Sequence, residues 1–321
     1  MSIAPIGISI GDPNGIGPEI TLKAIHALRH ADLPPLLPIG DPDLLAAEAR
    51  RLSLPLPANT LPGNRTYPQA NPGAISADAG AVSAEWVQTG IQACLRHQLS
   101  ALVTAPICKE SWHLAGIPYP GHTELLADQC NTKRFGMLLA GKGLRVMLAT
   151  RHIPLRRVAD TLTPADIRLA AELLCEGLPL LGVPSPRIAI CGLNPHAGDG
   201  GTLGTEERDW IAPLIADMAR DGLPVSGPHP ADTVFHQAIQ GDYDAILALY
   251  HDQGLAPLKL WAFDEGVNLT LGLPIFRTSP DHGTAFAIAG KNLARPDSIL
   301  AAIRTAATLA AGNNPWTVQT V

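Results

Sequence analysis

Aromatic residues are scarce in this chain, which has 321 residues and only 14 Phe, Trp and Tyr side chains. Its core must therefore be built from Ala, Leu, Ile and Val, and apolar residues make up 46% of the sequence. Charged residues are also few, at 16%, which excludes intrinsic disorder. The length predicts two domains or one large α/β unit with a sizeable core.

Long hydrophobic runs are missing, because no stretch reaches the roughly 18 apolar residues needed to span a bilayer. The segment Met1–Gly11 has no basic region before its apolar residues and no signal-peptide pattern. The five cysteines are scattered and form no C-x-x-C pair, so disulfide staples and a structural zinc cluster are not expected. We therefore expect a cytoplasmic protein with no membrane partner.

A basic excess is also missing, since 23 Lys and Arg stand against 29 Asp and Glu, for a net charge of −6. This balance excludes a general attraction to nucleic acid or to anionic membranes. A small anionic substrate stays possible, because a local basic cluster can oppose the net charge.

One local pattern recurs along the chain: a short apolar run, a polar loop with Gly or Pro, and a helix-like segment. The runs are Ile6–Ile10, Ala101–Val103, Arg145–Ala149, Arg187–Cys191 and Ala245–Leu249. This alternation predicts a largely parallel sheet that is buried on both faces. Pro18 and Thr163 mark the starts of two predicted helices, and a third is predicted over 297–311. Residues 53–75 are expected to form loop or edge structure.

Three histidines follow three of these strand-like runs: His152, His196 and His251. Ligands of open α/β sheets bind beyond the carboxyl ends of the strands, so the sheet could bring the three imidazoles together. Three histidines with open coordination positions are typical of a catalytic metal site. Each could instead be a loop histidine whose nitrogens are satisfied by the backbone, and the sequence leaves both interpretations open.

Five polar residues are candidates for binding an anion. His122 and Thr123 precede a helix-like run, where a helix N-terminus favours negative charge, although Thr123 could merely cap that helix. Lys259, Asn268 and Arg277 interrupt apolar segments. Lys and Arg are common partners of phosphate, but these side chains could also be ordinary surface charges.

Dinucleotide and mononucleotide fingerprints are missing. Residues 11–17 and 198–204 are rich in Gly, but neither has the spacing G-x-G-x-x-G, and no G-x-x-x-x-G-K-[ST] occurs. The sequence therefore supports neither a Rossmann domain nor a P-loop.

Several longer motifs occur in order along essentially the whole chain. They are residues 11–19, Thr104-Ala105-Pro106 with Lys109, residues 121–124, residues 194–198, residues 250–254 and residues 278–285. Together they resemble the 4-hydroxythreonine-4-phosphate dehydrogenase (PdxA) family.

The resemblance implies an isocitrate/isopropylmalate dehydrogenase-like α/β fold. Such a fold has two α/β domains with a largely parallel sheet, a cleft between the domains and no Rossmann domain. We expect residues 1–125 and 270–321 to form the first domain, with a cofactor loop at 281–291. The second domain, 126–269, is expected to carry the metal ligands and the dimer contacts.

The activity implied is the oxidation of 4-phosphooxy-L-threonine at C3 by NAD or NADP. Decarboxylation to 3-amino-2-oxopropyl phosphate follows, within vitamin B6 (pyridoxal 5′-phosphate) biosynthesis. The expected cofactors are NAD or NADP and one divalent ion per site, such as zinc, magnesium or cobalt. The family also implies a homodimer with a shared active site, in which the ligand matching His251 comes from the partner chain.

Residue roles follow by motif from the same resemblance. His152, His196 and His251 match the metal ligands, and Asp281, His282 and Gly283 fall in the cofactor loop. The substrate-binding positions are matched by His122, Thr123, Lys259, Asn268 and Arg277. The general base is left open among Asp252, Lys109 and Asp232, and Asp252 could instead orient His251.

Three other functions are compatible with parts of the sequence. One is a dehydrogenase of 4-phospho-threonate or 4-phospho-erythronate in sugar-acid catabolism. A second is a three-histidine metal-dependent phosphoester hydrolase or lyase, which has no need of the 281–291 loop. A third is a ligand-binding regulatory domain, against which stand the ionisable groups at the strand ends.

Overall fold

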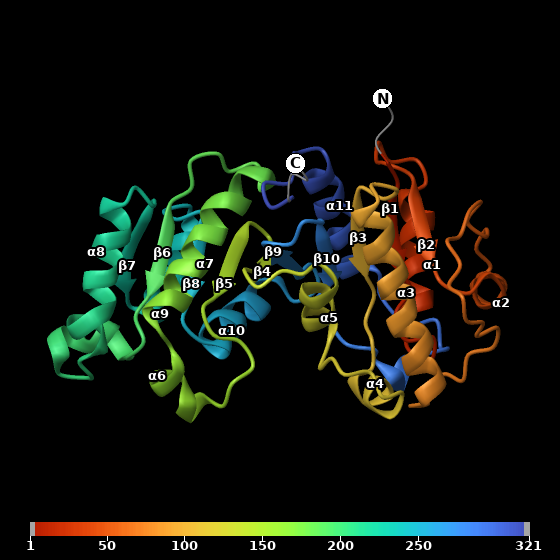
Figure 1. Ribbon diagram of the computed structural model, residues 1–321, viewed down its shortest axis with the longest axis horizontal. Coiled ribbons are helices and arrows are strands. Elements are labelled where there is room, and N and C mark those ends of the chain that lie inside the picture. Colours follow the sequence, from red (N-terminus) through yellow and green to blue (C-terminus); the bar gives the residue numbers. More distant parts are fainter. Residues whose placement is uncertain (1–3, 318–321) are drawn as a thin grey trace. The chain divides into compact units, whose positions relative to one another are not determined.

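The computed structural model describes residues 4–317, which divide into two compact units (Figure 1). Of the described residues, unit 1 comprises 4–133 and 273–317, and unit 2 comprises 134–272. The sequence predicts boundaries after residues 125 and 269, whereas the two units divide after residues 133 and 272. The helix that begins at His122 therefore falls wholly in unit 1.

Unit 1 contains four parallel strands in the order β2-β1-β3-β10. They are β1 (Ile6–Ser9), β2 (Leu36–Ile39), β3 (Ala101–Thr104) and β10 (Arg277–Pro280). β1 and β3 are buried along their whole length, as the continuous apolar runs predict.

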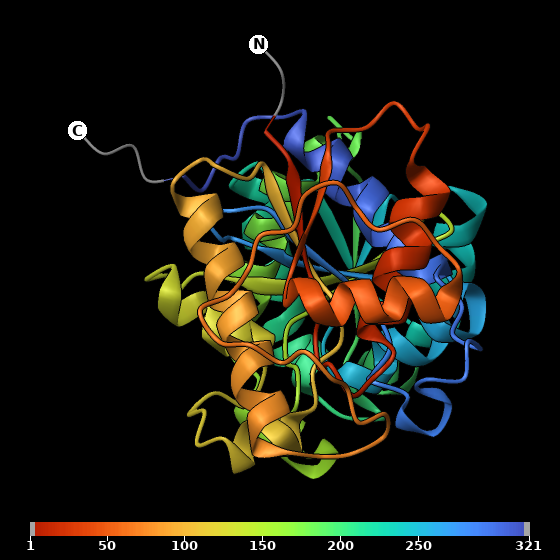
Figure 2. The same ribbon diagram turned by 90° about the vertical axis from the view of Figure 1, so that its right-hand side faces the viewer.

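Helices cover both faces of the unit 1 strands, and Figure 2 shows α3 and α11 on opposite sides of them. The helices are α1 (Gly17–Leu28), α2 (Pro42–Leu52), α3 (Ala77–Leu95), α4 (Lys109–Leu114), α5 (His122–Gln129), the 3-10 turn η5 (Phe286–Ile288) and α11 (Asp297–Ala310). Pro18 lies in the first turn of α1, as predicted. The C-terminal helix is confirmed within one residue of its predicted end.

Unit 2 contains six strands in the order β9-β4-β5-β8-β6-β7. They are β4 (Gly136–Gly141), β5 (Leu144–Leu148), β6 (Ile188–Cys191), β7 (Val225–His229), β8 (Ala245–Ala248) and β9 (Val267–Leu271). β5, β8, β6 and β7 run parallel, so the strand ends that precede the three candidate histidines lie at one edge.

A hairpin departs from the predicted parallel pattern. β4 is antiparallel to both β5 and β9, and only Lys142 and Gly143 connect it to β5. Both connecting residues have positive φ, of 47° and 84°, which is the backbone of a tight hairpin turn. The sequence pattern predicts β5 but not the antiparallel strand before it.

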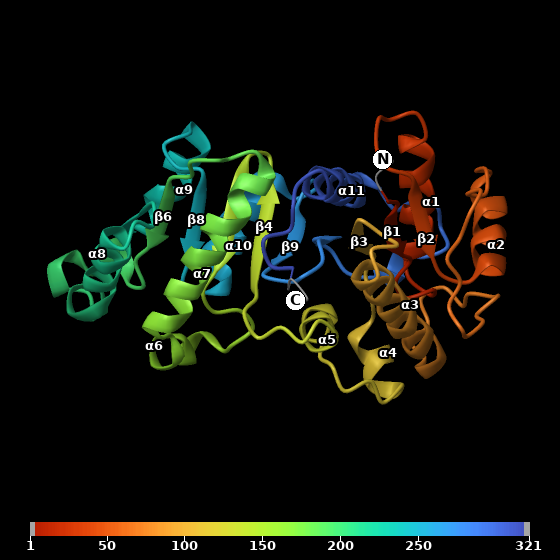
Figure 3. The same cartoon turned by 45° about the horizontal axis from the view of Figure 1, so that its top comes forward.

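Helix α7 of unit 2 (Pro164–Gly177) begins where the sequence provides a capping group. Thr163 accepts a hydrogen bond from Asp166 N, and Asp166 accepts one from Thr163 N at 2.9 Å, which confirms the predicted cap of α7. Figure 3 shows α7 running across the strands of this unit. The helices are η1 (Leu155–Arg157), α6 (Val158–Thr161), α7 (Pro164–Gly177), η2 (Leu178–Leu181), η3 (Pro195–Gly201), the π-helix η4 (Glu207–Ile211), α8 (Ala212–Arg220), α9 (Ala231–Gln240) and α10 (His251–Ala262).

The apolar run after His251 forms part of helix α10, and its Leu255 and Leu258 pack on Val146 and Ile246 of the strands. Among the described helices, none combines the length and the apolar character needed to cross a membrane.

Candidate functional site

A buried arginine begins strand β10 in unit 1. The side chain of Arg277 is only 3% exposed, and Thr104, at the end of β3, accepts hydrogen bonds from its Nε at 3.2 Å and its Nη2 at 2.8 Å. Burial lowers the pKa of Arg277 to about 10, which still leaves the guanidinium charged at neutral pH. The structure therefore provides a fixed positive charge in a dehydrated setting, rather than a solvated surface charge.

His122 is the first residue of α5 and lies near this guanidinium. Burial first, and then the positive charges of Arg277 and Lys109, hold the pKa of His122 well below its ordinary value of 6.5. Its ring meets the buried ring of Trp112 edge-on, with 5.7 Å between centroids. The imidazole is thus neutral at pH 7 in the absence of a ligand, and one of its ring nitrogens still carries a hydrogen that can be donated to an anion.

Lys109 approaches the same corner, since its Cε lies 3.6 Å from the position that a Cβ on Gly121 would take. Lys109, His122, Thr123 and Arg277 are called the anion cluster below. The carboxylate of Glu124 lies at the same distance from that Cβ position, so the corner holds one negative charge beside its two cations. The remaining positive charge, the helix N-terminus and the neutral imidazole suit a phosphate group.

Two predicted substrate residues carry buried polar atoms that no described residue satisfies: Nε2 of His122 and Oδ1 of Asn268. Such atoms are costly unless a ligand or solvent completes their hydrogen bonds. Asn268 lies on β9 opposite Leu139 of β4, and Lys259 lies on α10, so both belong to unit 2. The unsatisfied atoms of His122 and Asn268 are what residues that hydrogen-bond a ligand would show.

The predicted cofactor loop follows β10 in unit 1. Its start is fixed by a hydrogen bond of 3.1 Å from Asp281 N to Ser298 Oγ, and Ile16 N donates to Thr284 O at 3.0 Å. His282 and Gly283 are exposed, and no described heavy atom lies within 4 Å of the position of a Cβ on Gly283. The backbone of this loop is therefore open to a ligand at residues 282 and 283.

Two of the three candidate metal ligands meet in unit 2. The rings of His152 and His251 have centroids 5.5 Å apart, and both line a pocket of about 200 Å³ together with Arg151, Ile153, Leu155, Val158, Tyr250 and Asp252. Asp252 lies 2.7 Å from Nδ1 of His251. A neutral His251 that donates from Nδ1 to this carboxylate presents Nε2 as a metal-binding nitrogen.

His196, the third candidate ligand, follows β6 in a loop of unusual backbone. Residues 196–200 all have positive φ, including the non-glycine residues His196, Ala197 and Asp199. Each such residue costs free energy that surrounding contacts must offset, and clusters of them are typical of functional sites. Nε2 of His196 lies 4.0 Å from Oδ2 of Asp232 on α9. Between residues 4 and 317, no group of three His, Cys, Asp or Glu side chains of one chain is gathered as a metal site.

A buried glutamate, which the sequence did not single out, supports the His196 loop. Oε1 of Glu207 accepts hydrogen bonds from Leu193 N at 2.7 Å and Asn194 N at 2.6 Å, and its Oε2 accepts one from Asn194 Nδ2 at 2.9 Å. Glu207 is 4% exposed and lies at the start of the π-helix η4, a form that is frequent near functional sites. Glu207 lies thirteen residues from Asn194, and no local pattern in the sequence connects the two.

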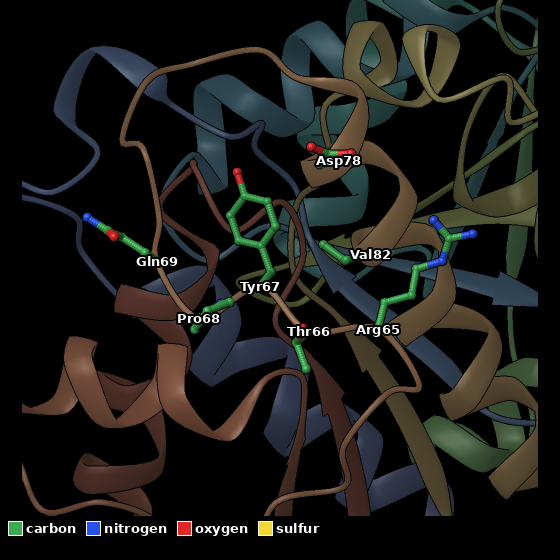
Figure 4. Close-up of a pocket in the computed structure, with 7 residues that line it drawn as sticks. All are labelled: Arg65, Thr66, Tyr67, Pro68, Gln69, Asp78 and Val82. Carbon is green, nitrogen blue, oxygen red and sulfur yellow. The ribbon is translucent and has the colours of Figure 1, made fainter.

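A second pocket, of about 370 Å³, lies in unit 1 between the segment predicted as loop and the first turns of α3 (Figure 4). It is lined by Arg65, Thr66, Tyr67, Pro68, Gln69, Asp78 and Val82, none of which the sequence analysis selected. Tyr67 donates from its hydroxyl to Asn14 at 3.2 Å, which ties this loop to the Gly-rich segment 11–17.

Comparisons with known proteins agree with the motifs. The family model described as "Pyridoxal phosphate biosynthetic protein PdxA" matches residues 33–306. A protein of Ruegeria sp. (strain TM1040) named 4-hydroxythreonine-4-phosphate dehydrogenase is 46% identical, over 98% of this chain and 100% of the relative.

Solved structures extend the comparison. A crystal structure of 4-hydroxythreonine-4-phosphate dehydrogenase from Klebsiella pneumoniae has a TM-score of 0.86 at 39% identity, covering 96% of this chain and 99% of that one. The β-decarboxylating dehydrogenase of Thermococcus kodakarensis reaches a TM-score of 0.52 at 14% identity, over 97% of this chain and 84% of that one, and shows the fold alone. The predicted isocitrate/isopropylmalate dehydrogenase-like fold is thus confirmed, and the chain belongs to the PdxA family of pyridoxal phosphate biosynthetic proteins.

Proposed function

We propose that this chain is an NAD(P)-dependent dehydrogenase that oxidises 4-phosphooxy-L-threonine at C3. The resulting β-keto acid loses carbon dioxide and yields 3-amino-2-oxopropyl phosphate, as a step of pyridoxal 5′-phosphate biosynthesis in the cytoplasm. The observation that carries the proposal is the similarity to named dehydrogenases of this reaction over nearly the whole chain. The anion cluster supports a phosphorylated substrate independently of that similarity.

The phosphate end is assigned to the anion cluster. Arg277 provides a buried charge oriented by Thr104, and His122 and Thr123 add donors at the start of α5. Lys259 and Asn268 are assigned to further polar groups of the substrate. Because these contacts involve no reacting bond, they supply binding energy and alignment.

The histidines of unit 2 fit a divalent ion in the chemistry of their donor set. Two neighbouring imidazoles, one of them with Nδ1 against a carboxylate, match ions such as zinc or cobalt. His152, His196 and His251 would hold the ion, which when bound would make the C3 hydroxyl more acidic.

The cofactor is assigned to the loop that begins at Asp281, through its open backbone at His282 and Gly283. NAD or NADP would accept the hydride, while the protein provides alignment. Lys109 and Asp252 are proposed for proton transfer, with Asp252 also able to orient His251. Asp252→Asn separates these roles: a loss of metal affinity indicates orientation, and a lower kcat at unchanged metal affinity indicates proton transfer.

The working unit is proposed to be a homodimer with shared sites. Helix α10 begins with His251 and ends beside exposed apolar side chains, of which Leu260 is 90% and Phe263 74% exposed. Exposed apolar groups of this size are typical of surfaces that a partner covers, and a second copy of the chain is the simplest partner.

Mixing two inactive variants tests the shared site. His196→Ala and His251→Ala proteins are combined and allowed to exchange subunits, because His152 and His251 of one chain lie side by side and their two variants could not complement each other if that pair serves one site. With random exchange about half the dimers are mixed, and each mixed dimer rebuilds one intact site of two, so activity returns to about one quarter of the unaltered level. If all ligands of a site came from one chain, activity would not return even after complete exchange.

The activity itself is tested by incubating the protein with 4-phosphooxy-L-threonine, NAD or NADP and a divalent ion. Absorbance of the reduced nicotinamide is expected to rise, and to stop rising when a chelator is added. Parallel reactions with 4-phospho-threonate and 4-phospho-erythronate compare the related substrates. Release of inorganic phosphate without any nicotinamide reduction would replace the proposal with a phosphoester hydrolase.

A further inference from the structure

A chain of hydrogen bonds crosses the strand ends that carry the three histidines. Leu249, the residue after β8, lies at its centre. Its carbonyl accepts from Thr150 Oγ1 at 2.6 Å and from Thr150 N at 3.2 Å, and its own N–H donates to Gln253 Oε1 at 2.7 Å. Thr150 follows β5 and precedes His152 by two residues, so these bonds fix the end of β5 to the end of β8.

Gln253 continues the chain to the next strand. Its Nε2 donates to the carbonyl of Gly192 at 2.7 Å, and Gly192 N in turn donates to His229 O at 2.8 Å. Gly192 follows β6 and precedes the left-handed loop of His196. The same amide therefore connects the ends of β8 and β6, and the bond from Gly192 reaches β7.

Gln253 is buried and lies close to His251, so this connection joins the strand ends next to the candidate ligands. It is 8% exposed and lies two residues after His251 on α10, and the strand-end residue Leu249 is fully buried. One buried side chain thus uses its acceptor for the strand end before His251 and its donor for the strand end before His196. Buried hydrogen bonds of this kind restrict geometry, because breaking one leaves two unsatisfied groups.

We propose that Gln253 is a positioning residue that fixes the strand ends from which His152, His196 and His251 follow, and so sets the geometry of the ligands that one chain offers to bound divalent ions. The inference rests on the proposed function, because it assumes that these histidines hold the ion. Gln253 would act through the loops and would contact neither the ion nor the substrate. Glu207 holds the backbone of the His196 loop from the other side, so the loop has two buried anchors.

The test uses the whole protein freed of metal, with Co²⁺ as the probe, because its visible absorption reports the geometry of its ligands. Gln253→Met keeps the length of the side chain and removes both hydrogen bonds. Gln253→Glu, measured at pH 8, keeps the acceptor for Leu249 and loses the donor to Gly192. The matched controls are Gln240→Met and Gln240→Glu, since Gln240 is an exposed residue at the end of α9.

Both Gln253 variants are expected to bind Co²⁺ about 10- to 100-fold more weakly and with an altered spectrum, whereas the Gln240 variants match the unaltered protein. An irreversibly misfolded fraction would lower the amplitude of the Co²⁺ signal at an unchanged midpoint, and urea unfolding of the metal-free variants measures any reversible loss of stability, which would weaken binding only in proportion to the unfolded fraction. kcat should fall while the KM for the phosphorylated substrate stays constant. If Gln253→Met does not fold, Gln253→Glu carries the test.

The outcomes separate the two proposals. Gln253 variants that bind Co²⁺ with unaltered affinity and spectrum would overturn the role of Gln253 and leave the metal site standing. Failure of the unaltered protein to bind Co²⁺ would overturn the metal site, and the positioning role with it.

Discussion

The anion cluster of unit 1 and the histidine loops of unit 2 place their polar groups in opposite ways. Arg277 is almost fully buried, and Thr104 accepts two of its hydrogen bonds. The His196 side chain, by contrast, is 65% exposed on a loop with five successive left-handed residues. A non-reacting phosphate is best met by charges fixed in advance, whereas a metal ligand must leave its nitrogen accessible and can be held from below through its backbone.

The comparison predicts that the exposed site is easier to alter without harming the fold. His196→Ala is expected to reduce metal-dependent turnover to the background rate, because one of the three proposed ligands is lost. Its thermal unfolding should change little, since the imidazole is mostly exposed. Turnover and bound metal are measured together, the latter by elemental analysis.

His196→Asn provides the control for backbone strain, because Asn tolerates the left-handed conformation better than Ala does. It should be equally inactive and at least as stable as the Ala variant. Normal metal content and normal turnover in both variants would show that His196 is not a ligand.

In the buried cluster, Arg277→Ala is expected to raise the KM for the phosphorylated substrate. Loss of a charged, two-pronged contact corresponds to about 1.5–3 kcal/mol of binding, or roughly 10- to 100-fold. The KM for NAD should stay nearly constant. Arg220→Ala, which removes an exposed guanidinium, is the matched control. An unchanged KM for the substrate would remove Arg277 from the phosphate site.

The sequence was most informative where chemistry follows a buried strand. The runs that end before His152, His196 and His251 form parallel strands with a common edge, because apolar β-branched runs between helices specify such strands strongly. The Thr163 cap could also be predicted from the sequence, because Thr163 and its partner Asp166 lie within one helical turn.

What the sequence did not predict has two causes: a local turn without its usual residues, and contacts between residues that are distant in the chain. The turn at Lys142 and Gly143 that makes β4 antiparallel lacks the usual Asn-Gly signal. The supports of the histidine loops, Gln253 and Glu207, bond to backbone groups of other strands, so neither is marked by its neighbours in the chain. The pocket around Tyr67 arises from a long irregular segment with no periodic pattern.

A substitution at Thr104 tests whether the orientation of the buried Arg277 matters, because Thr104 should affect substrate binding only through Arg277. Thr104→Val keeps the shape of the side chain and removes the acceptor for two hydrogen bonds. The guanidinium loses its orientation, and the KM for the phosphorylated substrate is expected to rise by about 1 kcal/mol, or roughly fivefold. Thr104→Ser, which restores the hydroxyl, should return the KM to near the unaltered value, and failure of this rescue would assign the effect of Val to packing.

The smallest expected effect is a pH dependence of stability that comes from His122. Its pKa in the folded protein lies well below the ordinary value of 6.5, so the folded state stays neutral where the unfolded chain already binds a proton. Stability should therefore fall as the pH drops below about 6.5, with a slope of at most about 1.4 kcal/mol per pH unit from this one group.

The measurement is urea unfolding between pH 5 and 7.5 for the unaltered protein and for His122→Asn, which cannot titrate. The unfolding free energy of the unaltered protein minus that of His122→Asn should decrease as the pH falls, because only the unaltered protein loses this contribution. Parallel curves would mean that burial and the cations Arg277 and Lys109 do not hold His122 neutral in the folded protein.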